Sequence, residues 1–297
     1  MTKPDIPQQM GLFSEPKRLF VCTPSRLASY EDCPRRYRYT YLDRPTPPRG
    51  APWAHNSLGA SVHTALKSWF DLAPAKRTPG ALATLLRATW VRDGYRDGEQ
   101  EQAAFERALT WLHRYVAELP DGFEPLAVER TVGARTASLA LSGRVDRIDD
   151  VAGELVIVDY KTGRSGLGPD DARGSRALAL YAYSAARLFR RKCRRVELHH
   201  LPTGTVAAHE HTEESIERHV RRAEQTAADI VEAQGRLTAG EDPDVAFPTT
   251  PGSLCGWCDF RRFCPAGSTR PGHEQWAGVE RGERPVEDAW LEGAPID

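Results

Sequence analysis

The chain has 297 residues, with 40 lysines and arginines against 41 aspartates and glutamates, giving a formal net charge of −1. Its length and its 40% of hydrophobic residues allow a substantial core that needs no disulfides. A near-neutral total does not exclude nucleic-acid binding, because such binding depends on a local basic face. Composition therefore leaves the partner open.

The N-terminal residues are not expected to form a secretory signal. Residues 1–17 are polar and rich in proline, without the charged start and apolar run of a secretory signal. The sequence has no apolar stretch of about 18 residues, so we expect no membrane span and a cytoplasmic protein. Thiols stay reduced in the cytosol. The six cysteines are therefore expected to be metal ligands or core residues.

Helical signals dominate the first part of the chain. Residues 1–19 are expected to be a flexible lead-in. Over residues 23–42, Thr23 or Ser25 as N-cap and Pro24 in the first turn predict a helix, which Pro34 should interrupt. A proline-rich loop follows. Apolar residues at helical spacing then predict helices over residues 57–69, 80–95 and 101–119.

The pattern then changes to short runs of Val, Ile and Leu separated by Gly and Asp, which is typical of strands. The later elements are predicted as strands over 126–131, 138–148 and 154–159, a helix over 176–192, strands over 195–201 and 205–210, and a helix over 213–233. Residues 271–297 are expected to be a flexible tail. This order predicts an α/β core inside a helical wrapper.

The strongest chemical signal is the segment SGRVDRIDDVAGELVIVDYKTG, residues 142–163. Its second strand ends in Asp159-Tyr160-Lys161, so Asp159 and Lys161 should project from one face and Tyr160 from the other. A hairpin would bring Asp146 near Asp159, and two carboxylates at a strand end suit Mg²⁺ or Mn²⁺. A lysine beside them can orient a water or stabilise charge on a phosphate. The alternative is that the aspartates are turn residues and Lys161 is solvated.

These residues resemble the PD-(D/E)xK nucleases, and within them the RecB-family exonucleases. The matching motifs are GRVDRID, a strand ending in VDYKTG, and a following helix with a tyrosine. The resemblance implies a restriction-endonuclease-like core, which is a mixed central sheet flanked by helices. It also implies that Asp146, Asp159 and the backbone carbonyl of Tyr160 bind the metal and that Lys161 is catalytic.

The resemblance extends to three further side chains. The segment GASVHTAL places His63 where the family has a metal-binding histidine on a helix, and Glu129 resembles an acidic residue often present in these sites. Tyr181 matches the helical tyrosine. Alone, His63 would be read as a helix-face histidine bonded to a neighbour, and Glu129 as surface charge. The family usually has a glutamine four residues before the tyrosine, and Ala177 departs from this pattern.

Four of the cysteines form a second motif. Cys255, Cys258 and Cys264 make a CxxC-x5-C arrangement, and Cys33 is a fourth candidate far upstream. Four thiolates suit either a 4Fe–4S cluster or zinc, and spacing alone leaves both open. A subset of RecB-family nucleases, including AddB and CRISPR-associated members, has this cysteine pattern. The resemblance implies a 4Fe–4S cluster that clips the two ends of the domain together. Cys22 and Cys193 are expected to be ordinary thiols.

Basic and aromatic residues lie beside these cysteines and are candidate DNA contacts, since arginine binds phosphate and tyrosine stacks on bases. The candidates are Arg35, Arg36, Tyr37, Arg38, Arg261 and Arg262. The alternative is an amphipathic helix with an aromatic core face and solvated arginines.

The sequence thus predicts one nuclease domain over residues 20–270, with a helical part over about 53–120, a nuclease core over about 124–235, and a cluster segment over 250–266 clipped to Cys33. The expected activity is metal-dependent hydrolysis of DNA, by an exonuclease acting at single-stranded ends in repair or recombination. No GxxxxGK[ST] helicase motif is present, so any motor would be a separate protein. The alternative is a weak or inactive iron–sulfur DNA-binding subunit of a larger complex, which Ala177 favours.

Overall fold

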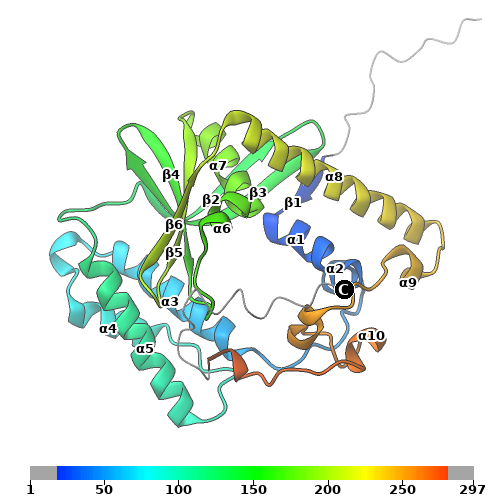
Figure 1. Ribbon diagram of the computed structural model, residues 1–297, viewed down its shortest axis with the longest axis horizontal. Helices are drawn as coiled ribbons and strands as arrows, with labels where there is room; N and C mark the ends of the chain where they lie inside the picture. Colours follow the sequence, from blue (N-terminus) through cyan, green and yellow to red (C-terminus); the bar gives the residue numbers. More distant parts are fainter. Residues whose placement is uncertain (1–18, 280–297) are drawn as a thin grey trace, which may run out of the picture.

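The computed structural model describes residues 19–279 and is built around a six-stranded mixed sheet (Figure 1). The strands are β1 (Phe20–Cys22), β2 (Ala127–Arg135), β3 (Leu139–Val151), β4 (Glu154–Lys161), β5 (Cys193–His200) and β6 (Thr205–Glu210). The helices are α1 (Pro24–Asp32), α2 (Pro34–Tyr41), α3 (Ala54–Phe70), α4 (Pro79–Ala88), α5 (Gly98–Ala117), α6 (Pro169–Gly174), α7 (Arg176–Phe189), α8 (Glu213–Thr238), α9 (Pro243–Ala246) and α10 (Pro265–Ser268), with short 3-10 turns η1 (Pro74–Lys76), η2 (Ser253–Trp257) and η3 (Ala277–Val279). The expected α/β fold, a mixed central sheet flanked by helices, is confirmed.

Local signals place the first two helices. The Thr23 hydroxyl accepts a hydrogen bond from the backbone N–H of Arg26 at 3.1 Å and so caps α1. Pro34 begins α2 instead of continuing α1, because proline fits the first turn of a helix and not its interior. The predicted interruption at Pro34 is therefore present.

The long strand β3 organises the sheet. It pairs with β2 along one edge in antiparallel register, from Arg135 opposite Ala140 to Ala127 opposite Ile148. The other edge is shared: β1 pairs in parallel with Leu139–Leu141, and β4 pairs antiparallel from Arg147 onward. The stretch of β3 between these two partners, which contains Asp146, is therefore open on that edge.

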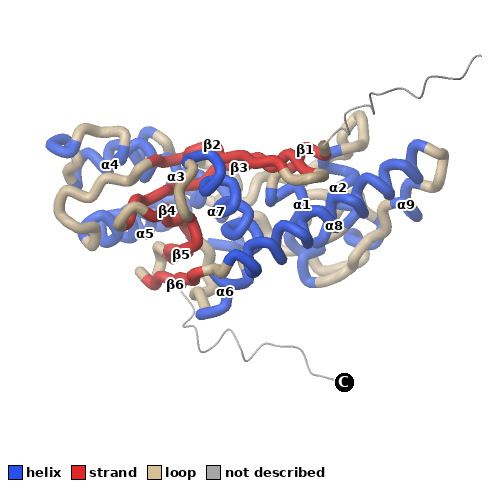
Figure 2. Tube along the Cα trace, turned by 90° about the horizontal axis from the view of Figure 1, so that it is seen from above, coloured by secondary structure: helices blue, strands red, loops and turns tan. Residues whose placement is uncertain are grey.

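The sheet is covered on both faces, and each face has its own core. On one face Leu155 and Ile157 of β4 pack with Leu178 of α7 and Ile230 of α8. On the other face the alternate residues of β4, Val156, Val158 and Tyr160, pack with α3, α4 and α5. Viewed from above, α3, α4 and α5 lie at one end of the molecule, and α1, α2, α8 and α9 lie at the other (Figure 2).

A local distortion crosses β2 and β3 at Glu129 and Asp146. The ladder pairs Val128 with Arg147 and Arg130 with Val145, but it does not pair Glu129 with Asp146. Glu129 has a positive φ of 46°, which is a strained conformation for a residue other than glycine. The distortion also shifts the alternation of side chains along β3. Val145 and Ile148 are three residues apart, yet both lie in the core that contains α7.

The C-terminal part returns to the start of α3. Residues 271–279, assigned to a flexible tail by their composition, are packed: Gln275 O accepts the backbone N–H of Ala54 at 3.0 Å, and Val279 is buried against α3 and α5. Apolar burial of Val279 provides the ordering that composition did not reveal. The remaining predicted tail, 280–297, and the predicted lead-in up to residue 18 lie outside the described residues. Across residues 19–279, no helix combines the length and apolarity needed to cross a membrane.

Candidate metal centre

Three possible metal ligands from three different elements meet beside the open edge of β3. His63 comes from α3, Glu129 from β2 and Asp146 from β3, and one ligand atom from each lies within 4.8 Å of the others. His63 Nδ1 is 3.3 Å from Asp146 Oδ2. Among the residues that the structure describes, no other three histidine, cysteine or acidic side chains meet this distance.

The backbone of β4 fixes the Asp146 carboxylate. The N–H of Tyr160 donates a hydrogen bond to Asp146 Oδ2 at 2.9 Å. This bond spans the place where β3 and β4 stop pairing, since their ladder begins at Arg147 and Val158. The Asp146 side chain therefore accepts the hydrogen bond that a backbone carbonyl would accept in a continued ladder, and this bond keeps its carboxylate near His63.

Asp159 and Lys161 form an ion pair at the end of β4. Lys161 Nζ is 2.6 Å from Asp159 Oδ2, and the two residues share one face of the strand while Tyr160 is buried on the other, as the alternation predicts. Asp159 is not one of the three clustered ligands. The structure thus brings Asp146 together with His63 and Glu129, and places Asp159 beside Lys161.

Burial and like charge set the electrostatics of this centre. Burial raises the pKa of Asp159, and Asp146 acts in the same direction, while Lys161 opposes both. Burial also raises the pKa of Glu129, with a further contribution from Asp146. For His63, burial acts to lower the pKa, but the hydrogen bond and charge of Asp146 outweigh it, so its pKa is raised. The centre is short of positive charge, which is what a cation would supply.

Two glycines allow the helices to approach the centre closely. A Cβ at Gly143 of β3 would lie 2.4 Å from Tyr181 Cε1 of α7, so only glycine lets this ring cross the strand. A Cβ at Gly59 of α3 would lie 3.2 Å from Thr162 Oγ1, just beyond β4. Burial raises the pKa of Tyr181 to about 12, with Asp159 as the next contribution, so the phenol stays protonated beside the carboxylates. Ala177 lies one turn earlier on α7.

A buried polar network behind the centre was missed by sequence reasoning. Arg147 is paired with Asp149 at 2.9 Å, and its guanidinium also donates to the Tyr115 hydroxyl at 2.5 Å. Tyr115 in turn contacts His199 Nδ1 at 3.0 Å, and its ring packs edge-on against Tyr160. The available signal was the opposite charges of Arg147 and Asp149 two residues apart on one strand, which places both on the same face. The network braces Tyr160, the residue between Asp159 and Lys161.

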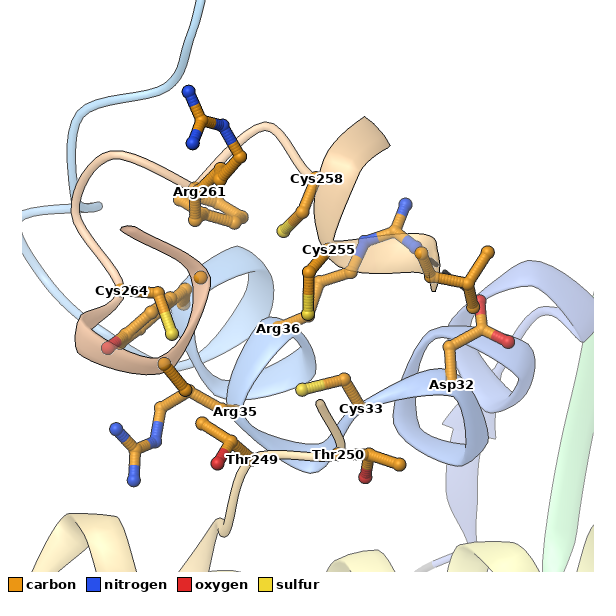
Figure 3. A pocket seen from close by; sticks show the side chains of 15 residues that line it. Asp32, Cys33, Arg35, Arg36, Thr249, Thr250, Cys255, Cys258, Arg261 and Cys264 are labelled. Atoms are coloured by element: carbon orange, nitrogen blue, oxygen red, sulfur yellow. Dashed lines mark hydrogen bonds and ion pairs between the residues drawn. The ribbon is translucent and has the colours of Figure 1, made fainter. Parts of the chain in front are cut away.

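The four motif cysteines line one pocket. Cys33 lies between α1 and α2, and Cys255, Cys258 and Cys264 come from the segment around η2 and α10; Figure 3 shows their sulfur atoms facing a common space. All six cysteines of the chain lie within the described residues and are free thiols. No three of the four sulfurs lie within 4.8 Å of one another. Cys22 and Cys193 are buried in the core, as ordinary thiols would be.

Three of the predicted DNA-contact residues are interior. Tyr37 is fully buried and stacks on Phe247, so the prediction of base stacking by Tyr37 is wrong. Arg35 and Arg38 are 5% and 7% exposed and both bind Asp244 of α9, so they join the two ends of the domain and cannot reach DNA. The aromatic face of α2 and the charge of Asp244 draw these side chains inward.

The other three DNA-contact candidates remain accessible. Arg36 is half-exposed and pairs with Asp32 at 3.4 Å, and Arg262 is exposed. Arg261 is partly buried and donates a hydrogen bond to Arg270 O at 2.9 Å. Arg36 and Arg261 line the cysteine pocket.

The sequence matches a known family over most of its length. The profile described as the PD-(D/E)XK nuclease superfamily matches residues 21–265. The chain belongs to the PD-(D/E)XK nuclease superfamily. Membership implies a nucleic-acid substrate, and nucleases of this superfamily typically use a divalent metal. No curated protein matches the chain.

Two solved structures are similar to this chain. One is a "Putative exonuclease" from Eubacterium rectale, with 12% sequence identity over 92% of this chain and 93% of that chain and a TM-score of 0.47. Another is the protein SSO0001, with 15% identity over 86% of this chain and 90% of that chain and a TM-score of 0.39.

The donor set fits a divalent cation. His63 offers an imidazole nitrogen, and Glu129 and Asp146 offer carboxylate oxygens, which are ligands that Mg²⁺ and Mn²⁺ accept. The like charges of Asp146 and Asp159, and the raised pKa of Asp159, indicate a centre whose repulsion a cation would relieve.

Proposed function

We propose that this protein is a metal-dependent deoxyribonuclease that hydrolyses phosphodiester bonds at this centre. The observation that carries the proposal is the convergence of His63, Glu129 and Asp146 from three elements beside the Asp159–Lys161 pair. His63, Asp146, Asp159 and the backbone carbonyl of Tyr160 would hold Mg²⁺ or Mn²⁺, and Glu129 would add a further carboxylate.

A divalent ion bound there would lower the pKa of a water molecule and polarise a phosphate oxygen. We assign to Lys161 the role of a cation that acts on the water and the phosphate. Its ammonium is half-exposed at the end of β4 and only one residue from the metal-facing backbone, so it can reach an incoming phosphate. It would orient the attacking water and stabilise the charge that develops on the phosphate. Tyr181, kept protonated by burial, can donate a hydrogen bond at the same place.

The proposed substrate is DNA with a single-stranded end, cut by exonuclease action in repair or recombination. The resemblance of GRVDRID and VDYKTG to RecB-family exonucleases supports this choice. A separate helicase or repair complex would then supply the single-stranded ends.

This proposal is tested with end-labelled and circular single-stranded DNA, incubated with Mn²⁺ or Mg²⁺ and either wild type or Asp159→Ala. Release of short products from linear DNA alone by the wild type, and none by Asp159→Ala, is expected. Because circular DNA has no ends, cutting of circular DNA would show that the protein is an endonuclease and not an exonuclease. Equal cutting by both proteins would reject the assignment of the site.

For the cysteine pocket we propose a 4Fe–4S cluster held by Cys33, Cys255, Cys258 and Cys264. The donor set of four thiols supports it. Four thiolates also suit zinc, which metal analysis distinguishes from iron. A larger cluster binds each thiolate at a separate iron. In this proposal residues 20–270 form one nuclease domain that the cluster clips together.

The cluster is tested by iron, sulfide and zinc analysis of anaerobically purified protein and of Cys255→Ser. About four irons per chain, lost in the variant, are expected, while a colourless zinc-loaded protein would reject the cluster. An iron-loaded wild type that binds DNA and cuts none would instead indicate a DNA-binding subunit, the alternative that Ala177 favours.

A further inference from the structure

Arg144 of β3 stands at the entrance to the proposed metal centre. Its Nε is 2.5 Å from Glu129 Oε2, and this carboxylate is one of the three clustered ligands. The Glu129 side chain is 11% exposed and the Arg144 side chain 70% exposed. The guanidinium therefore covers a buried carboxylate from the solvent side.

A metal ion and Arg144 would compete for the same group. The Glu129 side chain is 11% exposed and its carboxylate lies in the cluster with His63 and Asp146, so it is the less mobile partner. The guanidinium is the partner that can move, because the Arg144 side chain is 70% exposed and a long side chain gains conformational entropy on release. A doubly charged ion at Glu129 would repel the singly charged arginine.

Once released, Arg144 has a second use at the same place. It lies two residues from Asp146 on β3, so its planar fork of donors is within reach of a phosphate next to the one being attacked. We infer that Arg144 pairs with the Glu129 carboxylate in the metal-free protein and becomes a phosphate-binding residue for the DNA strand when the metal binds. This inference rests on the proposed function.

The exchange predicts effects of opposite sign for one substitution. Arg144→Gln removes a competing positive charge and should tighten Mn²⁺ binding about three- to tenfold, because a unit charge a few ångströms away is lost. The same substitution should weaken binding of a single-stranded oligodeoxynucleotide and reduce the slope of log K against log salt by about 0.7, the value for one phosphate contact. A residue with only a structural role would not give opposite effects.

The experiment measures Mn²⁺ affinity by calorimetry, and oligonucleotide affinity with Ca²⁺ in place of Mn²⁺ at several salt concentrations. Wild type, Arg144→Gln and Arg135→Gln are compared; Arg135 is an exposed arginine at the far end of β2 and controls for net charge. Tighter Mn²⁺ and weaker DNA binding in Arg144→Gln alone supports the inference.

Two results would overturn it in different ways. If Arg144→Gln leaves both affinities unchanged, or changes both in the same direction, this inference fails while the proposed function stands. If the wild type itself binds no Mn²⁺, the proposed function fails and this inference fails with it.

Discussion

The ring of Tyr181 lies across Gly143 so closely that a methyl group at position 143 would stand 2.4 Å from Tyr181 Cε1. Gly143 opens the GRVDRID motif, and Asp146 follows it by three residues. The missing side chain of Gly143 therefore allows α7 to pack closely against β3 beside its open edge. It lets a protonated phenol lie beside the carboxylates.

Gly143→Ala should push Tyr181 out of place. Overpacking of this kind costs about 1–3 kcal/mol of the free energy of unfolding, and we expect nuclease activity to fall as well. Urea denaturation and a cleavage assay measure the two effects. Gly163→Ala is the matched control, because a Cβ there meets nothing within 4 Å.

A double-mutant cycle isolates the contact. In a Tyr181→Ala background, Gly143→Ala should cost almost nothing, since the clashing ring is gone. An undiminished cost in that background would show that Gly143 matters for another reason.

Metal affinity should depend on the protonation of His63. Its pKa is raised above the ordinary value of 6.5, mainly because Asp146 outweighs the effect of burial. A metal binds only the deprotonated imidazole, so acidification should weaken Mn²⁺ binding from a pH above 6.5 downward. Calorimetry over a pH series that extends below and above 6.5 gives the profile.

His63→Asn should bind Mn²⁺ more weakly and with a flatter pH profile than the wild type. His113→Asn, a histidine on α5, should retain the wild-type profile. A wild-type profile in His63→Asn would remove His63 from the ligand set.

The buried pair Arg147–Asp149 should be costly to break from one side. Their side chains are 4% and 10% exposed, so Arg147→Met leaves a buried carboxylate without its cation. Loss of one partner of a buried pair costs about 3–5 kcal/mol. Arg147→Met/Asp149→Leu should recover most of that loss in a urea denaturation experiment. A double variant as unstable as the single one would contradict the pairing argument.

Glu197 should stabilise the fold above acidic pH. Hydrogen bonds from His199 and then Arg195 outweigh burial and lower its pKa from 4.5 to about 2. A lowered folded pKa gives stability that is complete above pH 4.5 and is lost as the pH falls toward 2. Glu197→Gln should therefore cost about 1–2 kcal/mol at neutral pH, because solvent screens part of the effect on this partly buried group, with the difference from the wild type shrinking below pH 4.5.

Glu210→Gln, a 60% exposed partner of Arg194, is the control and should change little at any pH. If Glu197→Gln and the wild type differ equally at pH 7 and pH 3, the pKa of Glu197 is not shifted as described.

Much of the fold follows from local signals in the sequence. The apolar run of β4 and its change to Asp159 and Lys161 predicted both the strand and the shared face of the two charged residues. Thr23 and Pro34 located the boundaries of α1 and α2. These features depend on neighbours within a few residues, so a single sequence is enough to find them.

Features that depend on distant contacts could not be predicted in the same way. Strict alternation gave no sign of the distortion at Glu129 and Asp146, which arises where two strands meet. Arg35 and Arg38 were predicted to face DNA because their partner, Asp244, is about two hundred residues away. Val279 was assigned to a tail because its packing surface is formed by α3 and α5.

The most direct test of the central claim separates metal binding from cutting. Mn²⁺ affinity and cleavage of end-labelled single-stranded DNA are measured for wild type, Asp146→Ala and Lys161→Ala. Asp146→Ala should lose both Mn²⁺ binding and cutting, whereas Lys161→Ala should bind Mn²⁺ normally and cut about 10²–10³-fold more slowly. A wild type that cuts no DNA with Mn²⁺, or an Asp146→Ala variant that cuts as fast as the wild type, would contradict the proposed nuclease centre.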